Sequence, residues 1–90
     1  MNTLLVGYDL NKPGQDYSGL IEALKGHGTW WHHLDSTWLV KTAKTASQLR
    51  DELMELVDAS DELLVMNVSG DLWATAGLEK RANEWLQEQV

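Results

Sequence analysis

Two polar residues of this chain stand where a side chain can act on a substrate. Asp9 directly follows the apolar run Leu4–Tyr8, which predicts a buried strand that delivers one carboxylate to the start of a loop. A carboxylate in that position can hold a divalent cation or activate water for phosphodiester hydrolysis. An aspartate also begins many loops because its side chain satisfies backbone donors, and the run alone favours this simpler interpretation.

The second residue is Ser36, which lies in a short break between two β-prone segments. No histidine and acid are arranged around it as in a hydrolase triad, so a turn role is favoured over a nucleophilic one. A two-fold axis near the end of the first strand would bring two copies of Asp9 together. That pair of carboxylates would bind one magnesium ion or hold a water between them, as phosphodiester hydrolysis requires. The sequence thus predicts a metal site at Asp9 that only a dimer completes.

Other common chemistries have little support. His32 and His33 are adjacent in a β-prone segment, so they point to opposite faces and cannot chelate one metal ion; only His33 and Asp35 share a face. The chain has no cysteine and no HxH or HExxH spacing, which argues against a zinc site. Its glycines follow neither the dinucleotide-binding nor the Walker pattern, so nucleotide binding is not indicated.

Composition bounds the class of protein. With 90 residues we expect a single domain over residues 1–90, with a core over residues 3–68 and a C-terminal strand and helix over residues 71–90. The absence of cysteine fits a reducing cytoplasm. No apolar run is long enough to span a bilayer, so no membrane partner is expected. The formal charge of −7 argues against tight, non-specific binding to nucleic acid.

The elements that must position Asp9 and Ser36 follow from periodicity and turn residues. The pattern predicts the order β-α-β-β-α-β, an α+β, ferredoxin-like sandwich with both helices on one face of a four-stranded antiparallel sheet. A short fifth strand at Leu72–Thr75 and a terminal helix after Gly77 are expected beyond it. The six core segments are Leu4–Tyr8, Tyr17–Leu24 with Asp16 as its cap, Thr29–Leu34, Thr37–Thr42, Thr45–Val57 with a capping box, and Glu62–Val68.

The second face of this sheet needs a cover, because the fourth strand is apolar on both of its faces. Either the segment Leu72–Leu86 covers it within one chain, or two subunits stack their sheets and exchange their last strands. Two-fold dimers are the commonest small oligomers, so we expect a homodimer. In either arrangement Trp73, Trp85 and Leu86 are expected to be buried.

Several motifs resemble a known family. The segments Val6–Gln15, Thr29–Trp38 and Asp61–Leu64 are similar to those of the short bacterial proteins labelled "SinR family", and the resemblance covers nearly the whole chain. The β-α-β-β-α-β order, with Asp9 after the first strand, also resembles the small CRISPR-associated adaptation subunit and the VapD-type endoribonuclease toxins. A repressor function, which the "SinR" label suggests, has no helix-turn-helix pattern to support it.

The resemblance implies a role for specific residues. In the CRISPR-associated family the aspartate after the first strand is the proposed metal ligand of a dimeric nuclease, which places that role at Asp9. A serine followed two positions later by an aromatic residue belongs to the hairpin there, matched by Ser36 and Trp38. The family's adaptation subunits bind DNA through basic residues, whereas this chain is acidic and lacks an arginine cluster.

Two functions therefore stay open at the level of sequence. The first is a dimeric, magnesium-dependent nuclease or toxin-like endoribonuclease with Asp9 from each subunit at the metal and Ser36 or backbone groups holding the phosphate. The alternative is a non-catalytic dimeric interaction or scaffold module in a defence, toxin–antitoxin or mobile-element system. In that case the acidic surface would bind a basic protein or imitate nucleic acid.

Overall fold

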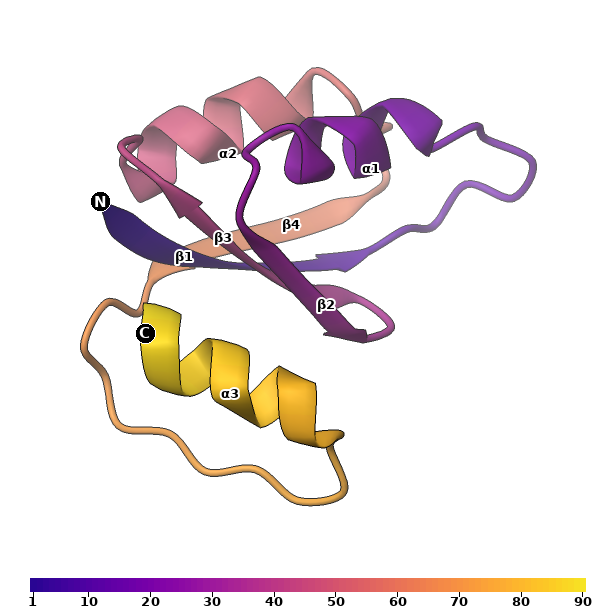
Figure 1. Cartoon of the computed structure of the whole chain (residues 1–90). Coiled ribbons are helices and arrows are strands. Elements are labelled where there is room, and N and C mark those ends of the chain that lie inside the picture. Colours follow the sequence, from indigo (N-terminus) through magenta and orange to yellow (C-terminus); the bar gives the residue numbers. More distant parts are fainter.

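The computed structural model describes all 90 residues and contains four strands and three helices (Figure 1). The α+β class and the terminal helix are as predicted. In chain order the elements are β1 (Asn2–Asp9), α1 (Ser18–Lys25), β2 (Trp30–Leu34), β3 (Thr37–Thr42), α2 (Ala46–Met54), β4 (Glu62–Asn67) and α3 (Lys80–Gln89).

The strands form one antiparallel sheet in the order β2-β3-β1-β4. β1 is one of the two central strands, and it pairs with β3 from Asn2 to Gly7 and with β4 from Leu4 to Asp9. β2 and β4 are the two edges. The β2–β3 ladder is irregular between Trp31 and Leu34, whereas the β1–β4 ladder is unbroken.

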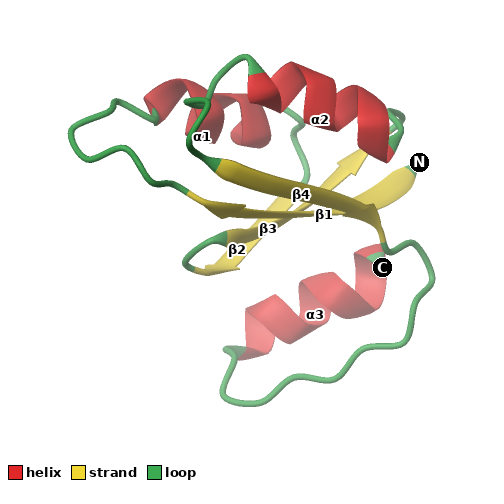
Figure 2. Cartoon of the chain, turned by 180° about the vertical axis from the view of Figure 1, so that it is seen from behind, coloured by secondary structure: helices red, strands yellow, loops and turns green.

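The main core lies between the sheet and the pair α1 and α2, which cover the same face (Figures 1 and 2). Alternation along β1 and β3 sends every second side chain into this layer, and each helix adds one apolar stripe. Trp38 is the largest side chain buried there. The buried cluster consists of Leu4, Val6, Leu20, Leu24, Trp38, Val40, Leu49 and Leu53.

The helix starts follow local chemistry. α2 begins with the predicted capping box, in which Thr45 and Gln48 each accept a hydrogen bond from the other's backbone N–H. The predicted cap of α1, Asp16, lies one residue before the N-cap position. Asp16 accepts the N–H of Ser18 at 2.9 Å, but the residue that precedes the helix is Tyr17, which has no side-chain cap bond.

The cover of the second face comes from the same chain. α3 lies on the side of the sheet opposite α1 and α2, as both views show (Figures 1 and 2). Its apolar stripe forms a second buried cluster of Trp31, Leu39, Ala82 and Leu86. The expectation of burial holds for Leu86, whereas Trp85 is half-buried and Trp73 is exposed.

Polar contacts hold both ends of α3. The buried Trp31 indole donates its Nε1–H to the Ala82 carbonyl oxygen at 3.1 Å. At the other end, Thr3 Oγ1 donates to the Gln89 carbonyl oxygen at 2.6 Å, and the Lys41 ammonium donates to the same oxygen. A cation beside the last carbonyls of a helix also opposes the negative end of the helix dipole.

The predicted fifth strand at Leu72–Thr75 is wrong. Residues 71–75 have no regular structure and swing away from the sheet to the far end of α3 (Figure 2). A strand needs a neighbouring edge to satisfy its backbone, and the path of this loop takes it away from β4. Leu72 is consequently fully exposed and Trp73 is 41% exposed.

The expectation that the fourth strand is covered on both faces is also wrong. Leu63 and Val65 pack against the main core below α2. On the opposite face α3 lies over the β2 side of the sheet, and Leu64 and Met66 stay 54% and 49% exposed. β4 therefore presents apolar side chains that nothing within the chain covers.

Candidate functional site: a carboxylate pair at the end of the central strand

Asp9 ends β1 and is exposed. Its register partner on β4 is Glu62, so the two residues lie directly opposite each other. Opposed residues of an antiparallel pair place their side chains on the same face, about 4.5 to 5.5 Å apart at Cβ. That face is the one toward α3, because Thr3 and Leu5, which alternate with Asp9 along β1, contact α3 or its cluster.

The two carboxylates border a shallow hollow of about 270 Å³ that also includes Gly7 and Leu64. The chain contains no group of three or more histidine or acidic side chains arranged to hold a metal ion. Magnesium, however, is commonly bound by one or two carboxylates, with water and substrate phosphate as its remaining ligands. The Asp9–Glu62 pair matches that smaller requirement within a single protomer.

Sequence analysis missed Glu62, although the sequence contains the signal. Glu62 begins the fourth strand and Asp9 ends the first. Antiparallel pairing of these two strands necessarily brings those ends together. Glu62 is therefore an alternative to a second copy of Asp9 as the other carboxylate at the metal, and it belongs to the same chain.

Ser36 lies at the same end of the sheet as Asp9. Its carbonyl oxygen accepts the N–H of Tyr8 at 3.1 Å, so the β2–β3 turn sits beside the last residues of β1. The Ser36 side chain is exposed. The structure thus brings the two predicted site residues to the same end of the sheet, Asp9 at the end of β1 and Ser36 in the β2–β3 turn.

An aromatic cluster fixes that turn. The Trp38 indole donates to Tyr8 Oη at 3.0 Å, and Tyr8 Oη donates to the Asp35 carbonyl oxygen at 3.4 Å. His32 stacks on Trp38 with ring centroids 3.9 Å apart, and its Nε2 lies 3.1 Å from the same Asp35 oxygen. Because a carbonyl only accepts, Nε2 carries the hydrogen in this contact.

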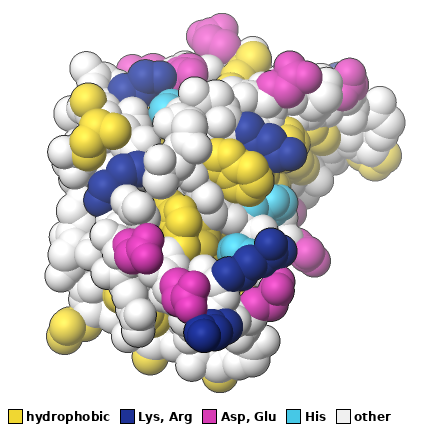
Figure 3. Space-filling view, in the orientation of Figure 1, with side chains coloured by type: hydrophobic (Ala, Val, Ile, Leu, Met, Phe, Trp, Pro, Cys, Tyr) yellow, Lys and Arg dark blue, Asp and Glu magenta, His cyan; other side chains and the backbone are white.

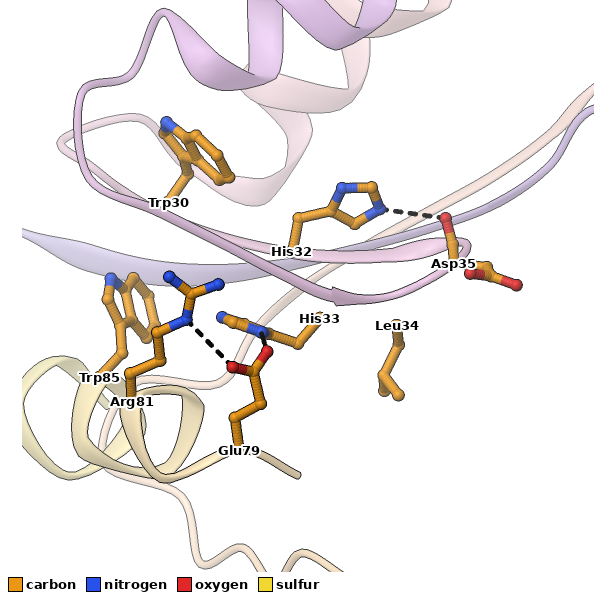
Figure 4. Close-up of a pocket in the computed structure, with 8 residues that line it drawn as sticks. All are labelled: Trp30, His32, His33, Leu34, Asp35, Glu79, Arg81 and Trp85. Atoms are coloured by element: carbon orange, nitrogen blue, oxygen red, sulfur yellow. Dashed lines mark hydrogen bonds and ion pairs between the residues drawn. The ribbon is translucent and has the colours of Figure 1, made fainter. Parts of the chain in front are cut away.

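A larger hollow, about 680 Å³ in volume, opens where β2 meets the start of α3 (Figure 4). Glu79 lies at its centre, 3.8 Å from His33 Nδ1 and 3.4 Å from Arg81 Nε. Trp30 and Trp85 border it on the two sides of the strand. Basic and acidic side chains are intermingled on this face, so it presents no continuous basic field (Figure 3).

A clamp at the carboxyl end of β1 joins the loop after Asp9 to the turn before β4. Asp58 accepts hydrogen bonds from the hydroxyl and the N–H of Ser60, and Lys12 pairs with it at 3.1 Å. The hydrogen bonds from Ser60, followed by the Lys12 ammonium, lower the pKa of Asp58 from 3.8 to about 2. The carboxylate therefore stays charged well below neutral pH.

Asp61 forms the second half of this clamp. Its carboxylate accepts the N–H of Asn11 at 2.7 Å and the hydroxyl of Tyr17 at 2.8 Å. Desolvation raises the pKa of Asp61, but the N–H donors of Asn11 and Asp58 outweigh it, so the net pKa lies below its usual value. The loop that follows Asp9 is thus tied directly to the strand that carries Glu62.

Comparison with protein-family models, with curated proteins and with solved structures finds no match to this chain. The family assignment therefore stays at the level of the motif resemblance. None of the three helices has both the length and the apolar character that crossing a membrane requires.

Proposed function

We propose that the protein is a homodimeric, magnesium-dependent nuclease of the CRISPR-adaptation-subunit and toxin-like endoribonuclease kind, acting in the cytoplasm. The observation that carries this proposal is the opposition of Asp9 and Glu62 at the exposed end of β1. Like charges directly opposite each other destabilise a sheet, so a chain that keeps two carboxylates there gains from a bound cation. The metal site proposed here uses one protomer in place of Asp9 from each subunit.

In this proposal Asp9 and Glu62 hold the magnesium ion. The metal would supply Lewis-acid stabilisation of the phosphodiester and a more acidic bound water. The clamp around Asp58 and Asp61 fixes the loop beside the metal ligands. Ser36, in the adjacent β2–β3 turn, would bind a phosphate oxygen through its exposed hydroxyl.

The sheet order supports the ferredoxin-like assignment. The position of β1 and β3 in the centre, of β2 and β4 at the edges and of α1 and α2 on one face favours a split β-α-β arrangement of the core. The same arrangement underlies the resemblance to the CRISPR-associated subunit and the VapD-type toxins. Fold alone does not establish an activity, so the weight of the proposal rests on the carboxylate pair.

The test is cleavage of labelled single-stranded RNA and of DNA with magnesium or manganese. We expect Asp9→Asn and Glu62→Gln each to reduce cleavage by at least about 100-fold, because each removes a metal ligand. The matched controls, Asp71→Asn and Glu88→Gln, neutralise exposed acids elsewhere and should retain activity.

A second readout does not depend on turnover. Without metal, Asp9→Asn should stabilise the protein by about 0.2 to 1 kcal/mol, since it removes a like-charge pair, whereas magnesium should stabilise only the unmodified chain. A wild-type protein that neither cleaves nucleic acid nor gains stability from magnesium would overturn the proposal.

The charge of the chain favours the second candidate, a non-catalytic dimeric scaffold that binds a basic protein partner. A formal charge of −7 repels a polyanion, and the intermingled charges around β2 offer it no continuous basic surface. This candidate expects no cleavage, no magnesium effect, and an association with a basic partner that weakens as salt increases.

A further inference from the structure

The two edges of the sheet differ in how they are protected. Edge strands expose unpaired backbone groups, and proteins usually guard them with bulges, charges or a covering element. The β2 edge has a register irregularity, and α3 packs against it. The β4 edge has no such irregularity: its ladder is regular, α2 covers only one of its two faces, and Glu62 is the one charged residue in the strand.

The hydrogen-bond pattern shows which backbone groups of β4 are free. Val68 donates its N–H to the Thr3 carbonyl oxygen at 2.9 Å, which fixes the phase of the ladder. Backbone groups alternate in direction along a strand. Glu62, Leu64 and Met66 therefore bond to β1, while Leu63, Val65 and Asn67 direct their N–H and C=O groups outward.

The side chains along this edge are apolar on both faces. Leu64 and Met66 are half-exposed on the α3 side of the sheet. On the other side a hollow of about 350 Å³ runs between β4 and α2, lined by Arg50, Leu63 and Val65 among others. An exposed regular strand with this composition favours pairing with another strand.

We propose that β4 pairs antiparallel with β4 of a second copy of this chain, about a two-fold axis at Val65, to form a continuous eight-stranded sheet. The two Val65 residues then exchange N–H···O=C bonds across the axis. Leu63 of each copy bonds to Asn67 of the partner subunit, so all three outward residues are satisfied.

The side chains select this register. Leu64 lies opposite Met66 of the partner subunit, and the same contact occurs twice because the interface is symmetric. These are non-hydrogen-bonded positions, where side chains approach most closely. A slip by one residue would direct Leu64 and Met66 to the opposite face from their partners, and an axis at Leu64 would place Glu62 against Met66.

The interface specifies the homodimer of the proposed function but not its metal site. The two β1 strands would be separated by three strand spacings, about 14 Å, and further along the strand direction. Asp9 of one copy therefore does not meet Asp9 of the other. Each protomer keeps its own Asp9–Glu62 pair. A variant can therefore lose dimer formation and still bind the metal, or lose metal binding and still dimerise.

The first test measures mass by light scattering. We expect a dimer at micromolar concentration, with a dissociation constant raised by about 100-fold or more in Leu64→Lys and Met66→Lys, because each would bury a charge. Leu72→Lys, which changes an equally apolar exposed residue away from β4, should leave the dimer intact.

The second test reports the register. The chain has no cysteine, so single cysteines can be introduced cleanly. An oxidised mixture of Leu64→Cys and Met66→Cys should form a disulfide between the two variants, since opposed Cα atoms about 4.5 Å apart suit that bond. Either variant alone places its cysteines beyond about 7 Å and should not cross-link.

A monomer at high micromolar concentration would overturn the interface, as would a dimer that Leu64→Lys and Met66→Lys leave unchanged. Cross-linking within each single variant instead of the mixture would overturn the register. Asp9→Asn should dimerise like the unmodified chain. A dimer with no magnesium effect would therefore reject the nuclease while supporting this interface.

Discussion

At the scale of single residues, the candidate site lies at the carboxyl end of β1. Asp9 and Glu62 face each other there, Ser36 lies in the adjacent β2–β3 turn, and Asp58 and Asp61 hold the loop that follows Asp9. The sequence predicted Asp9 and Ser36 because strand ends and turns are recognisable. Glu62 could have been found only by pairing the first strand with the fourth, and the clamp was not indicated because it depends on how two distant loops meet.

The clamp gives a residue-scale prediction about pH. A folded-state pKa of about 2 for Asp58, below the usual 3.8, means that its contribution to stability is present above about pH 4 and is lost as pH falls toward about 2. Asp58→Asn should therefore unfold at lower urea concentration than the unmodified chain at pH 7.

The difference between the two proteins should shrink as the pH falls from about 4 to about 2.5, where the carboxylate loses its advantage. Urea titrations at several pH values measure it. A difference that is the same at pH 7 and pH 2.5 would contradict the assigned role of the charged carboxylate.

At the scale of elements, features that depend on local sequence were predicted, whereas features that depend on tertiary context were not. The β2–β3 hairpin, the capping box of α2 and the amphipathic stripe of α3 are local, and each was predicted. The segment Leu72–Thr75 has β-prone residues but no adjacent edge to pair with, so the strand predicted from β-propensity alone does not form. The single-chain cover by α3 was one of two alternatives, because hydrophobic periodicity does not say which chain a helix packs on.

The docking of α3 gives an element-scale prediction. Lys41 and Thr3 both donate to the Gln89 carbonyl oxygen at the end of this helix. Lys41→Met keeps the length of the side chain but removes the cation, and should destabilise the protein by about 1 to 2 kcal/mol.

The matched control is Lys80→Met, which removes an exposed cation from the start of the same helix and should change stability by less than about 0.5 kcal/mol. Thermal unfolding followed by tryptophan fluorescence compares the two variants. Equal effects would show that Lys41 acts only through the net charge of the chain.

At the scale of the whole molecule, one sheet face is covered by two helices and the other by one, which lies to one side. This asymmetry leaves the β4 half of the second face apolar and open. The sequence correctly indicated excess apolar surface, but which strand carries it follows from the sheet order β2-β3-β1-β4. No pattern in the sequence specifies that order without a structural precedent.

An exposed edge of this kind makes stability depend on concentration. If folding and association are linked, the thermal midpoint of the unmodified chain should rise when protein concentration increases from roughly 1 to roughly 100 µM. Leu64→Lys should remove that rise while leaving the monomer folded, since Leu64 contributes little to the core. A midpoint independent of concentration in the unmodified chain would indicate a self-sufficient monomer.

The bond between Thr3 and Gln89 joins residues 86 positions apart, and α3 reaches that contact through a long irregular loop. A helix attached in this way can separate from the sheet without disturbing the ladders of β1, β3 and β4. We expect the amides of α3 to exchange with deuterium through such partial openings, faster than those of the central strands. Each opening would transiently uncover Trp31 and Leu39. The face that α3 normally shields would then expose apolar side chains on which other molecules can aggregate, and the rate of this exposure would be the rate at which α3 opens.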